Sequence, residues 1–91
     1  MNANGNYVRK PACEAVPLDD EWLIFDLDGC TVTKVNATGA LCWRELAAPR
    51  SVPALAEAVR AEYGADVPGV EDDVRAFVRE LSARGLIRDA R

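Results

Sequence analysis

The side chains that could do chemistry in this chain are carboxylates, lysines, tyrosines and thiols, because its 91 residues include no histidine. Histidine is the commonest general base and metal ligand, so its absence disfavours an acid–base or metal-dependent active site. Cys13, Cys30 and Cys42 are an odd number without CxxC spacing, which indicates neither a disulfide framework nor a zinc site. We therefore expect a reduced, cytoplasmic chain with no catalytic residues, no metal and no cofactor.

Two carboxylates, Asp26 and Asp28, follow an apolar run and are separated by one residue. The string Asp-Leu-Asp-Gly resembles the first motif of haloacid-dehalogenase-type phosphatases, in which these two positions are the nucleophile and the acid/base beside magnesium. That family also needs a lysine and a further acidic pair on a longer, parallel sheet, whereas the lysines here are Lys10 and Lys34. A plain Asp-Gly hairpin turn explains the string more simply, and a phosphatase fragment is kept as an alternative.

Length and composition indicate one globular domain with a single core. Hydrophobic residues make up 49% of the chain and charged residues 29%, which is an ordinary balance for a folded protein. The net charge of -4 disfavours nucleic acid as a partner, because affinity for phosphates comes from clustered Lys and Arg. No apolar run approaches the length of about 20 residues that a bilayer requires, so we expect no membrane partner.

Three short strands are predicted in the first part of the chain. Residues 15–18 and 22–27 are apolar segments joined by two aspartates, which predicts a hairpin. Asp28-Gly29 is a turn dipeptide in which we expect glycine to take a positive φ. The β-branched residues of Thr31–Val35 then predict a third antiparallel strand.

Three helices are predicted after the strands. Asn36 and Ser51 are suitable N-caps for the first two helices, which we expect to end before Pro49 and at Gly64. The third helix begins with acidic residues that its dipole favours and ends at Gly85. Its acidic turn is Glu71, Asp72 and Asp73, and its apolar stripe is Val70, Val74, Phe77, Val78 and Leu81.

These elements predict an α+β domain, with a three-stranded antiparallel sheet followed by three helices. Residues 1–11 lack periodicity and predict a flexible N-terminal arm, residues 12–87 the domain, and residues 88–91 a polar C-terminal tail. The helices should cover one face of the sheet, so at least one sheet edge should stay open.

Several strings taken together resemble the PqqD-like family. The resemblance spans about residues 12 to 87 and depends on the spacing of a strand–strand–helix core. Two positions depart from the family: Val35 stands where leucine is more frequent, and Thr33 where a larger, often aromatic, residue is frequent. The strings are residues 22–29, 33–40, 50–55, 73–77 and 81–87, together with Trp43 and Tyr63.

This resemblance implies a winged-helix-like, non-catalytic module that binds the leader segment of a ribosomally synthesised precursor peptide. The leader would add as a strand beside the third strand and place side chains in the groove between that strand and the third helix. The implied partners are the precursor peptide and a modifying enzyme or leader protease. The candidate peptide-binding residues are Thr31, Val32, Thr33, Lys34, Val35, Val70, Asp73, Val74, Phe77, Val78 and Leu81.

Other interpretations of the same features stay open. A winged-helix DNA-binding protein has a similar set of elements, although the acidic start of the third helix would repel phosphates. The open sheet edge would also allow a homodimer. Lys34 either prevents self-pairing of the edge strand or attracts an acidic leader residue. The acidic turn 71–73 either only complements the helix dipole or also meets a basic leader residue.

Overall fold

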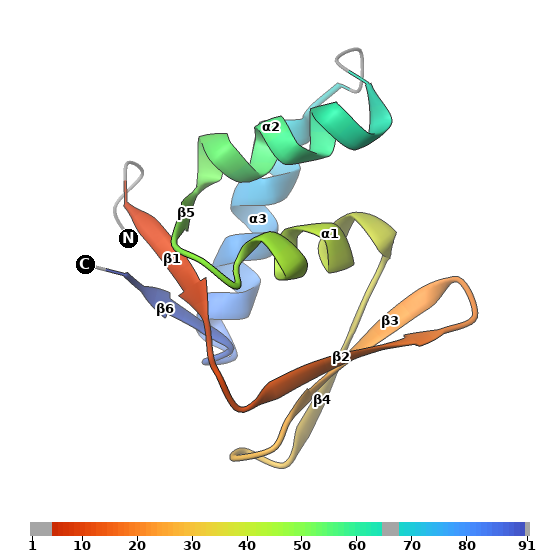
Figure 1. Cartoon of the computed structure of the whole chain (residues 1–91), viewed down its shortest axis with the longest axis vertical. Coiled ribbons are helices and arrows are strands. Elements are labelled where there is room, and N and C mark those ends of the chain that lie inside the picture. The colour runs from red at the N-terminus through yellow and green to blue at the C-terminus, as the bar shows by residue number, and fades with distance from the viewer. Residues whose placement is uncertain (1–4, 65–67, 91) are drawn as a thin grey trace.

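The computed structural model describes residues 5–64 and 68–90, which form three helices and two three-stranded antiparallel sheets (Figure 1). None of these helices is long and apolar enough to cross a membrane. In chain order the elements are β1 (Asn6–Arg9), β2 (Cys13–Leu18), β3 (Glu21–Asp26), β4 (Thr31–Val35), α1 (Ala37–Glu45), β5 (Arg50–Ser51), α2 (Val52–Tyr63), α3 (Val70–Ala83) and β6 (Ile87–Asp89).

The first sheet has the order β2-β3-β4 and is the one that the sequence predicts. Ile24 of β3 lies opposite Thr33 of β4, and both are buried together with Val35. Val32 and Lys34 alternate with these residues and are exposed. Because successive side chains of a strand point to opposite faces, Thr33 and Val35 face the helices while Val32 and Lys34 face away.

A second sheet, of order β5-β1-β6, shows that the prediction of a single sheet is wrong. Residues 6–9, predicted as part of a flexible arm, pair with β5 on one side and β6 on the other. Residues 87–89 form β6 and therefore take up part of the predicted tail. These pairings join segments from the start, middle and end of the chain, so no local sequence pattern predicts them.

Residues 1–4, 65–67 and 91 lie outside the described part of the chain. The winged-helix-like description of the fold stays a prediction.

The turn between β3 and β4 differs from the expected one. Cys30, not Gly29, takes the positive φ, at 55°. Glycine is needed at position 29 for another reason: a Cβ there would lie 2.8 Å from Oδ2 of Asp26. Oδ1 of Asp26 accepts hydrogen bonds from the backbone N–H groups of Asp28 and Gly29, both at 3.1 Å, and this arrangement closes the turn.

The predicted helix ends are confirmed. Oδ1 of Asn36 accepts the N–H of Gly39 at 2.8 Å, and Oγ of Ser51 accepts the N–H of Ala54 at 3.2 Å. These bonds satisfy N–H groups that the first turn of a helix leaves without a partner. Gly64 caps the end of α2 with a φ of 104°.

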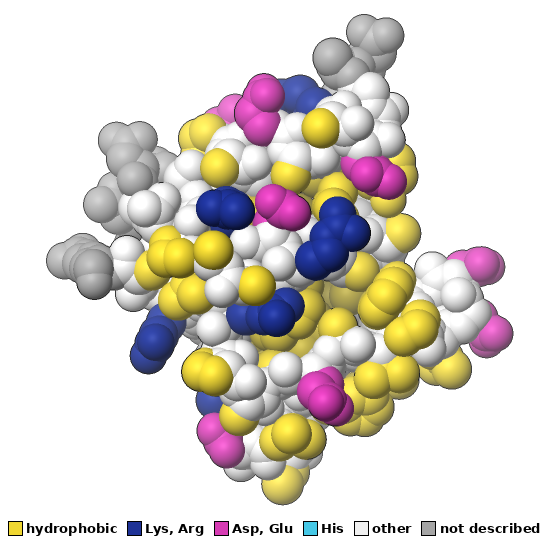
Figure 2. Space-filling model, in the orientation of Figure 1, with side chains coloured by type: hydrophobic (Ala, Val, Ile, Leu, Met, Phe, Trp, Pro, Cys, Tyr) yellow, Lys and Arg dark blue, Asp and Glu magenta, His cyan; other side chains and the backbone are white. Residues whose placement is uncertain are grey.

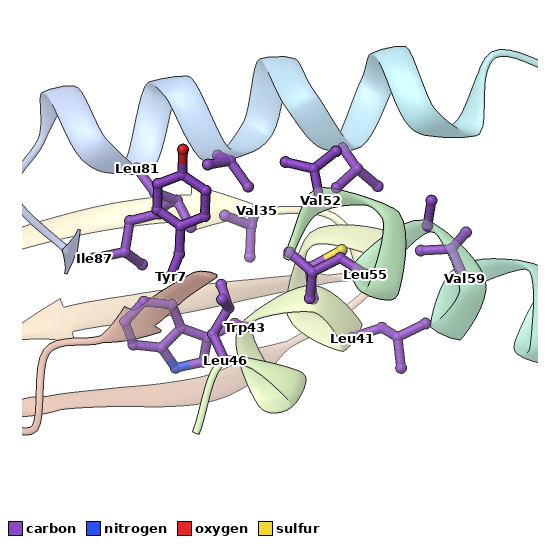
Figure 3. Packing of buried hydrophobic residues seen from close by; sticks show 14 of the residues in the cluster. Tyr7, Val35, Leu41, Trp43, Leu46, Val52, Leu55, Val59, Leu81 and Ile87 are labelled. Carbon is purple, nitrogen blue, oxygen red and sulfur yellow. The ribbon is translucent and has the colours of Figure 1, made fainter. Parts of the chain in front are cut away.

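The core lies between α1, α2, α3 and the inner faces of both sheets (Figure 3). Its largest fully buried side chain is Trp43 of α1. The guanidinium of Arg9 lies 5.6 Å from the Trp43 ring centroid and donates to the Trp43 carbonyl oxygen at 3.3 Å. Tyr7 of β1, with 4% of its surface exposed, belongs to the same core. The N-terminal strand is therefore part of the folded unit.

Replacing Tyr7 by alanine should lower the free energy of unfolding by about 3–5 kcal/mol, the usual cost of deleting a buried aromatic side chain. Tyr63, which is 48% exposed, provides a matched control, and Tyr63→Ala should cost about 1 kcal/mol or less. Urea unfolding followed by circular dichroism measures both. Equal urea midpoints of unfolding for Tyr7→Ala and the unchanged protein would show that Tyr7 of β1 does not contribute to stability.

Candidate functional site

The two edges of the β2-β3-β4 sheet differ in what they offer to an incoming chain. Pro17 lies on the β2 edge, opposite Trp22 of β3, and proline has no N–H to donate to a further strand. The β4 edge, residues 31–35, carries no proline and pairs with β3 alone. Unpaired N–H and C=O groups along such an edge are a template for strand addition. Both edges of this sheet are therefore open, but Pro17 removes one donor on β2, whereas the row of groups along β4 is uninterrupted.

A groove of about 660 Å³ begins at Asn36, the residue that follows β4. It lies between the start of α1, the end of α2 and one side of α3. Apolar side chains dominate its floor. The lining residues are Asn36, Thr38, Gly39, Cys42, Val59, Tyr63, Val70, Asp73, Val74, Ala76, Phe77 and Glu80.

Close packing of Phe77 against Gly39 joins α3 to the end of β4. A Cβ on Gly39 would lie 3.0 Å from Cε1 of Phe77 and 3.0 Å from Cβ of Val35. Such a distance is too short for an unstrained contact between carbon atoms. Glycine at position 39 therefore sets how near the Phe77 ring comes to β4 and shapes this end of the groove.

Helix α3 carries two neighbouring stripes, and the sequence-predicted residues divide between them. Val70, Val74, Val78 and Leu81 form the core stripe, and the last two have no exposed surface. Of these four, Val70 and Val74 reach the groove floor, whereas Val78 and Leu81 do not line the groove. The groove stripe consists of Asp73, Ala76, Phe77 and Glu80.

The β4 side chains do not line the groove, although all five residues were predicted to bind. Thr33 and Val35 are buried in the core, and Val32 and Lys34 lie on the outer face. Nζ of Lys34 is 3.5 Å from Oε1 of Glu21 on the neighbouring strand. What β4 can present to a ligand at its open edge is therefore its backbone.

Sequence reasoning missed most of the groove wall, namely Asn36, Thr38, Gly39, Cys42, Val59, Tyr63, Ala76 and Glu80. Three of them could have been found. Gly39 inside a predicted helix indicates a close approach of another element. Ala76 and Glu80 lie three and seven residues after Asp73, which places them on one helical face.

A second hollow, of about 570 Å³, lies on the other side of α1, against β2 and β3. Figure 2 shows its face of the molecule, with apolar side chains at the floor and Lys and Arg side chains nearby. Its charged lining residues are of both signs: Arg9, Arg44, Glu14 and Glu62. This hollow borders β2, the edge strand in which Pro17 has no N–H to donate.

Asp26, the position of a nucleophile in the phosphatase interpretation, has a structural role. Only 6% of its surface is exposed. Besides the two backbone N–H groups of the turn, its carboxylate accepts Nζ of Lys10 at 3.1 Å. These bonds fix the hairpin turn to the segment that follows β1. In residues 5–64 and 68–90, no group of three or more metal-ligating side chains is gathered in one place.

The thiol of Cys42 is equally unsuited to nucleophilic attack. Burial raises its pKa to about 11, so the thiol keeps its proton at neutral pH. Its place at the groove is that of a small apolar side chain.

Fold and groove together describe a small α+β domain with an edge strand, β4, and a groove beside α3. The family model described as coenzyme PQQ synthesis protein D (PqqD) matches residues 21–87, and the chain belongs to this family. The recognition made from the sequence is thereby confirmed. The comparison with curated proteins gives no match.

Two solved structures are similar to this chain over most of its length. TbiB1 in complex with the TbiA(beta) leader peptide is 30% identical, with a TM-score of 0.71, and the alignment covers 89% of this chain and 94% of that one. A lasso peptide synthetase B1 complexed with the leader peptide is 22% identical, with a TM-score of 0.70, covering 90% and 96%. The similarity to the lasso peptide synthetase B1 shows that the two proteins share a fold.

The Asp26 carboxylate should make stability depend on pH in the acidic range. Chiefly the N–H of Gly29, and then the Lys10 ammonium, hold the pKa of Asp26 below its usual value of 3.8. A lowered folded-state pKa stabilises the protein fully above about pH 4, and this contribution disappears as pH falls through the folded-state value. Thermal melts should therefore show Asp26→Asn to be less stable than the unchanged protein at pH 7, with a smaller difference at pH 3.

Asp28→Asn is the matched control, because the Asp28 side chain is exposed and lies 3.8 Å from Lys10. It should change the melting temperature little at either pH. Identical melting curves for Asp26→Asn and Asp28→Asn would contradict the structural role of Asp26.

Proposed function

We propose that this chain binds the leader segment of a ribosomally synthesised precursor peptide as an additional strand on β4. The observation that carries the proposal is the continuity of the open β4 edge with the groove beside Phe77. Backbone pairing with residues 31–35 supplies affinity with little demand on sequence, and the groove accepts a leader side chain that supplies selectivity.

The similarity to TbiB1 supports this proposal, because that protein is 30% identical and is in complex with a leader peptide. Membership of the PqqD family supports it further. The described residues offer the half-buried ring of Phe77, the small residue Gly39 beside it and the outer edge of β4, and an extended peptide can contact all three. Binding at micromolar affinity requires about -8 kcal/mol, which a short strand with one or two anchored side chains can supply.

On this proposal the chain transforms nothing and delivers the precursor to a modifying enzyme or a leader protease. Holding the leader raises the effective concentration of the remainder of the precursor at the partner's active site. Asp26 and Cys42, the two candidates for chemistry with buried functional groups, are committed to structural roles, which supports a non-catalytic function.

The test is a titration of isotope-labelled protein with the leader half of a precursor peptide encoded beside its gene, followed by backbone amide shifts. We expect shifts concentrated at residues 31–35 and at residues 70–80, with β2 unaffected. Saturating peptide that shifts β2 and the hollow on the other side of α1 would place the ligand elsewhere. Dilution without peptide is the control for self-association through β4, which would shift the same residues.

Phe77→Ala should weaken leader binding about tenfold, since the ring forms part of the groove wall. Phe25→Ala is a matched control: Phe25 is also half-buried, but it lies opposite Val32 on the outer face of the sheet. Fluorescence anisotropy with labelled leader gives both affinities, and thermal melts establish that each variant is folded. Equal affinities of the two variants would contradict the proposed position of the anchor.

A further inference from the structure

The groove beside α3 is acidic. Among the residues that the structure describes, its charged lining side chains are Asp73 and Glu80. They lie seven residues apart on one face of α3, which corresponds to about 10 Å along the helix axis. Phe77 lies between them, one turn after Asp73. A side chain anchored against Phe77 would therefore have a carboxylate on either side.

Among the four carboxylates of α3, Asp73 is the one without a cation. Its neighbours Glu71 and Asp72 both bond to Arg75, at 3.0 and 3.1 Å, and Glu80 lies 3.4 Å from Arg84. In the described part of the chain, no Lys or Arg pairs with Asp73. The nearest candidate on β4, Lys34, faces the outer side of the sheet and pairs with Glu21.

The helix dipole does not account for this arrangement by itself. Acidic residues in the first turn of α3 are favoured whichever face they occupy, and Glu71, Asp72 and Asp73 all meet that condition. What separates Asp73 from Asp72 is position: Asp73 lines the groove, whereas Asp72 does not and is bound to Arg75. Asp72 is thus a natural control for Asp73.

We propose that Asp73 selects leader peptides in which a lysine or arginine lies close to the apolar residue anchored at Phe77. The inference rests on the proposed function and names the class of peptide that the groove accepts. Residues four apart on a helix are about 6 Å apart, and an extended peptide advances about 3.3 Å per residue. The basic residue should therefore lie within about two positions of the anchor, with Glu80 as a second, weaker attraction.

The experiment uses a display library of random 15-residue peptides selected separately on the unchanged protein, Asp73→Lys and Asp72→Lys. Peptides enriched on the unchanged protein and on Asp72→Lys should carry Lys or Arg within about two positions of an aromatic or aliphatic residue. Peptides enriched on Asp73→Lys should lose this preference and favour Asp or Glu. Thermal melts check that both variants are folded, and both lose a first-turn carboxylate equally.

Affinities of one enriched peptide and of its Lys→Glu or Arg→Glu derivative make the test quantitative. The substitution in the peptide should weaken its binding to the unchanged protein and to the Asp72→Lys variant about five- to tenfold. It should weaken binding to the Asp73→Lys variant less, or strengthen it. Equal losses on all three proteins, or enriched peptides without basic residues, would overturn this inference and leave the proposed function standing. Failure of the unchanged protein to enrich any peptide would contradict the proposed function itself.

Discussion

A three-stranded sheet has two edges with unpaired backbone hydrogen-bonding groups, and the two edges of the β2-β3-β4 sheet differ in this chain. Pro17 interrupts the donors on β2, whereas β4 keeps a full set on its open side. The cap at Asn36 turns the chain into α1 directly after Val35. β4 therefore pairs on one side only, and the groove lining begins at the residue that follows it. The proposed binding of an extended peptide depends on this asymmetry.

The second sheet and the core hold α3 at its place beside that edge. Gly85 ends α3, and β6 then pairs with β1, which also pairs with β5 at the start of α2. The N–H groups of Arg9 and Lys10 bond to the carbonyl oxygens of Leu46 and Leu86, so the end of β1 and the next residue join the end of α1 to the segment after α3. Long-range pairings thus fasten the ends of α1 and α3 to the N-terminal strand.

Local rules were sufficient to predict the three strands of the first sheet and the helix caps at Asn36 and Ser51. The second sheet could not be predicted, because its short strands come from the start, the middle and the end of the chain. The apolar stripe of α3 was found, but sequence could not tell that Val78 and Leu81 face the core while Asp73 and Phe77 face the groove. That division depends on how α1 and α2 lie against α3. Glycine at position 29 was explained from the sequence by a positive φ. The structure gives another reason, which is the close approach of the Asp26 carboxylate.

Amide hydrogen exchange with and without the leader peptide tests strand addition on β4 most directly. Alternate β4 amides already bond to β3, so the leader should slow exchange of the remaining, outward amides within residues 31–35 by about tenfold or more. Exchange along β2 should not change. Protection confined to β2, or unchanged exchange in β4 with saturating peptide, would rule out strand addition on β4.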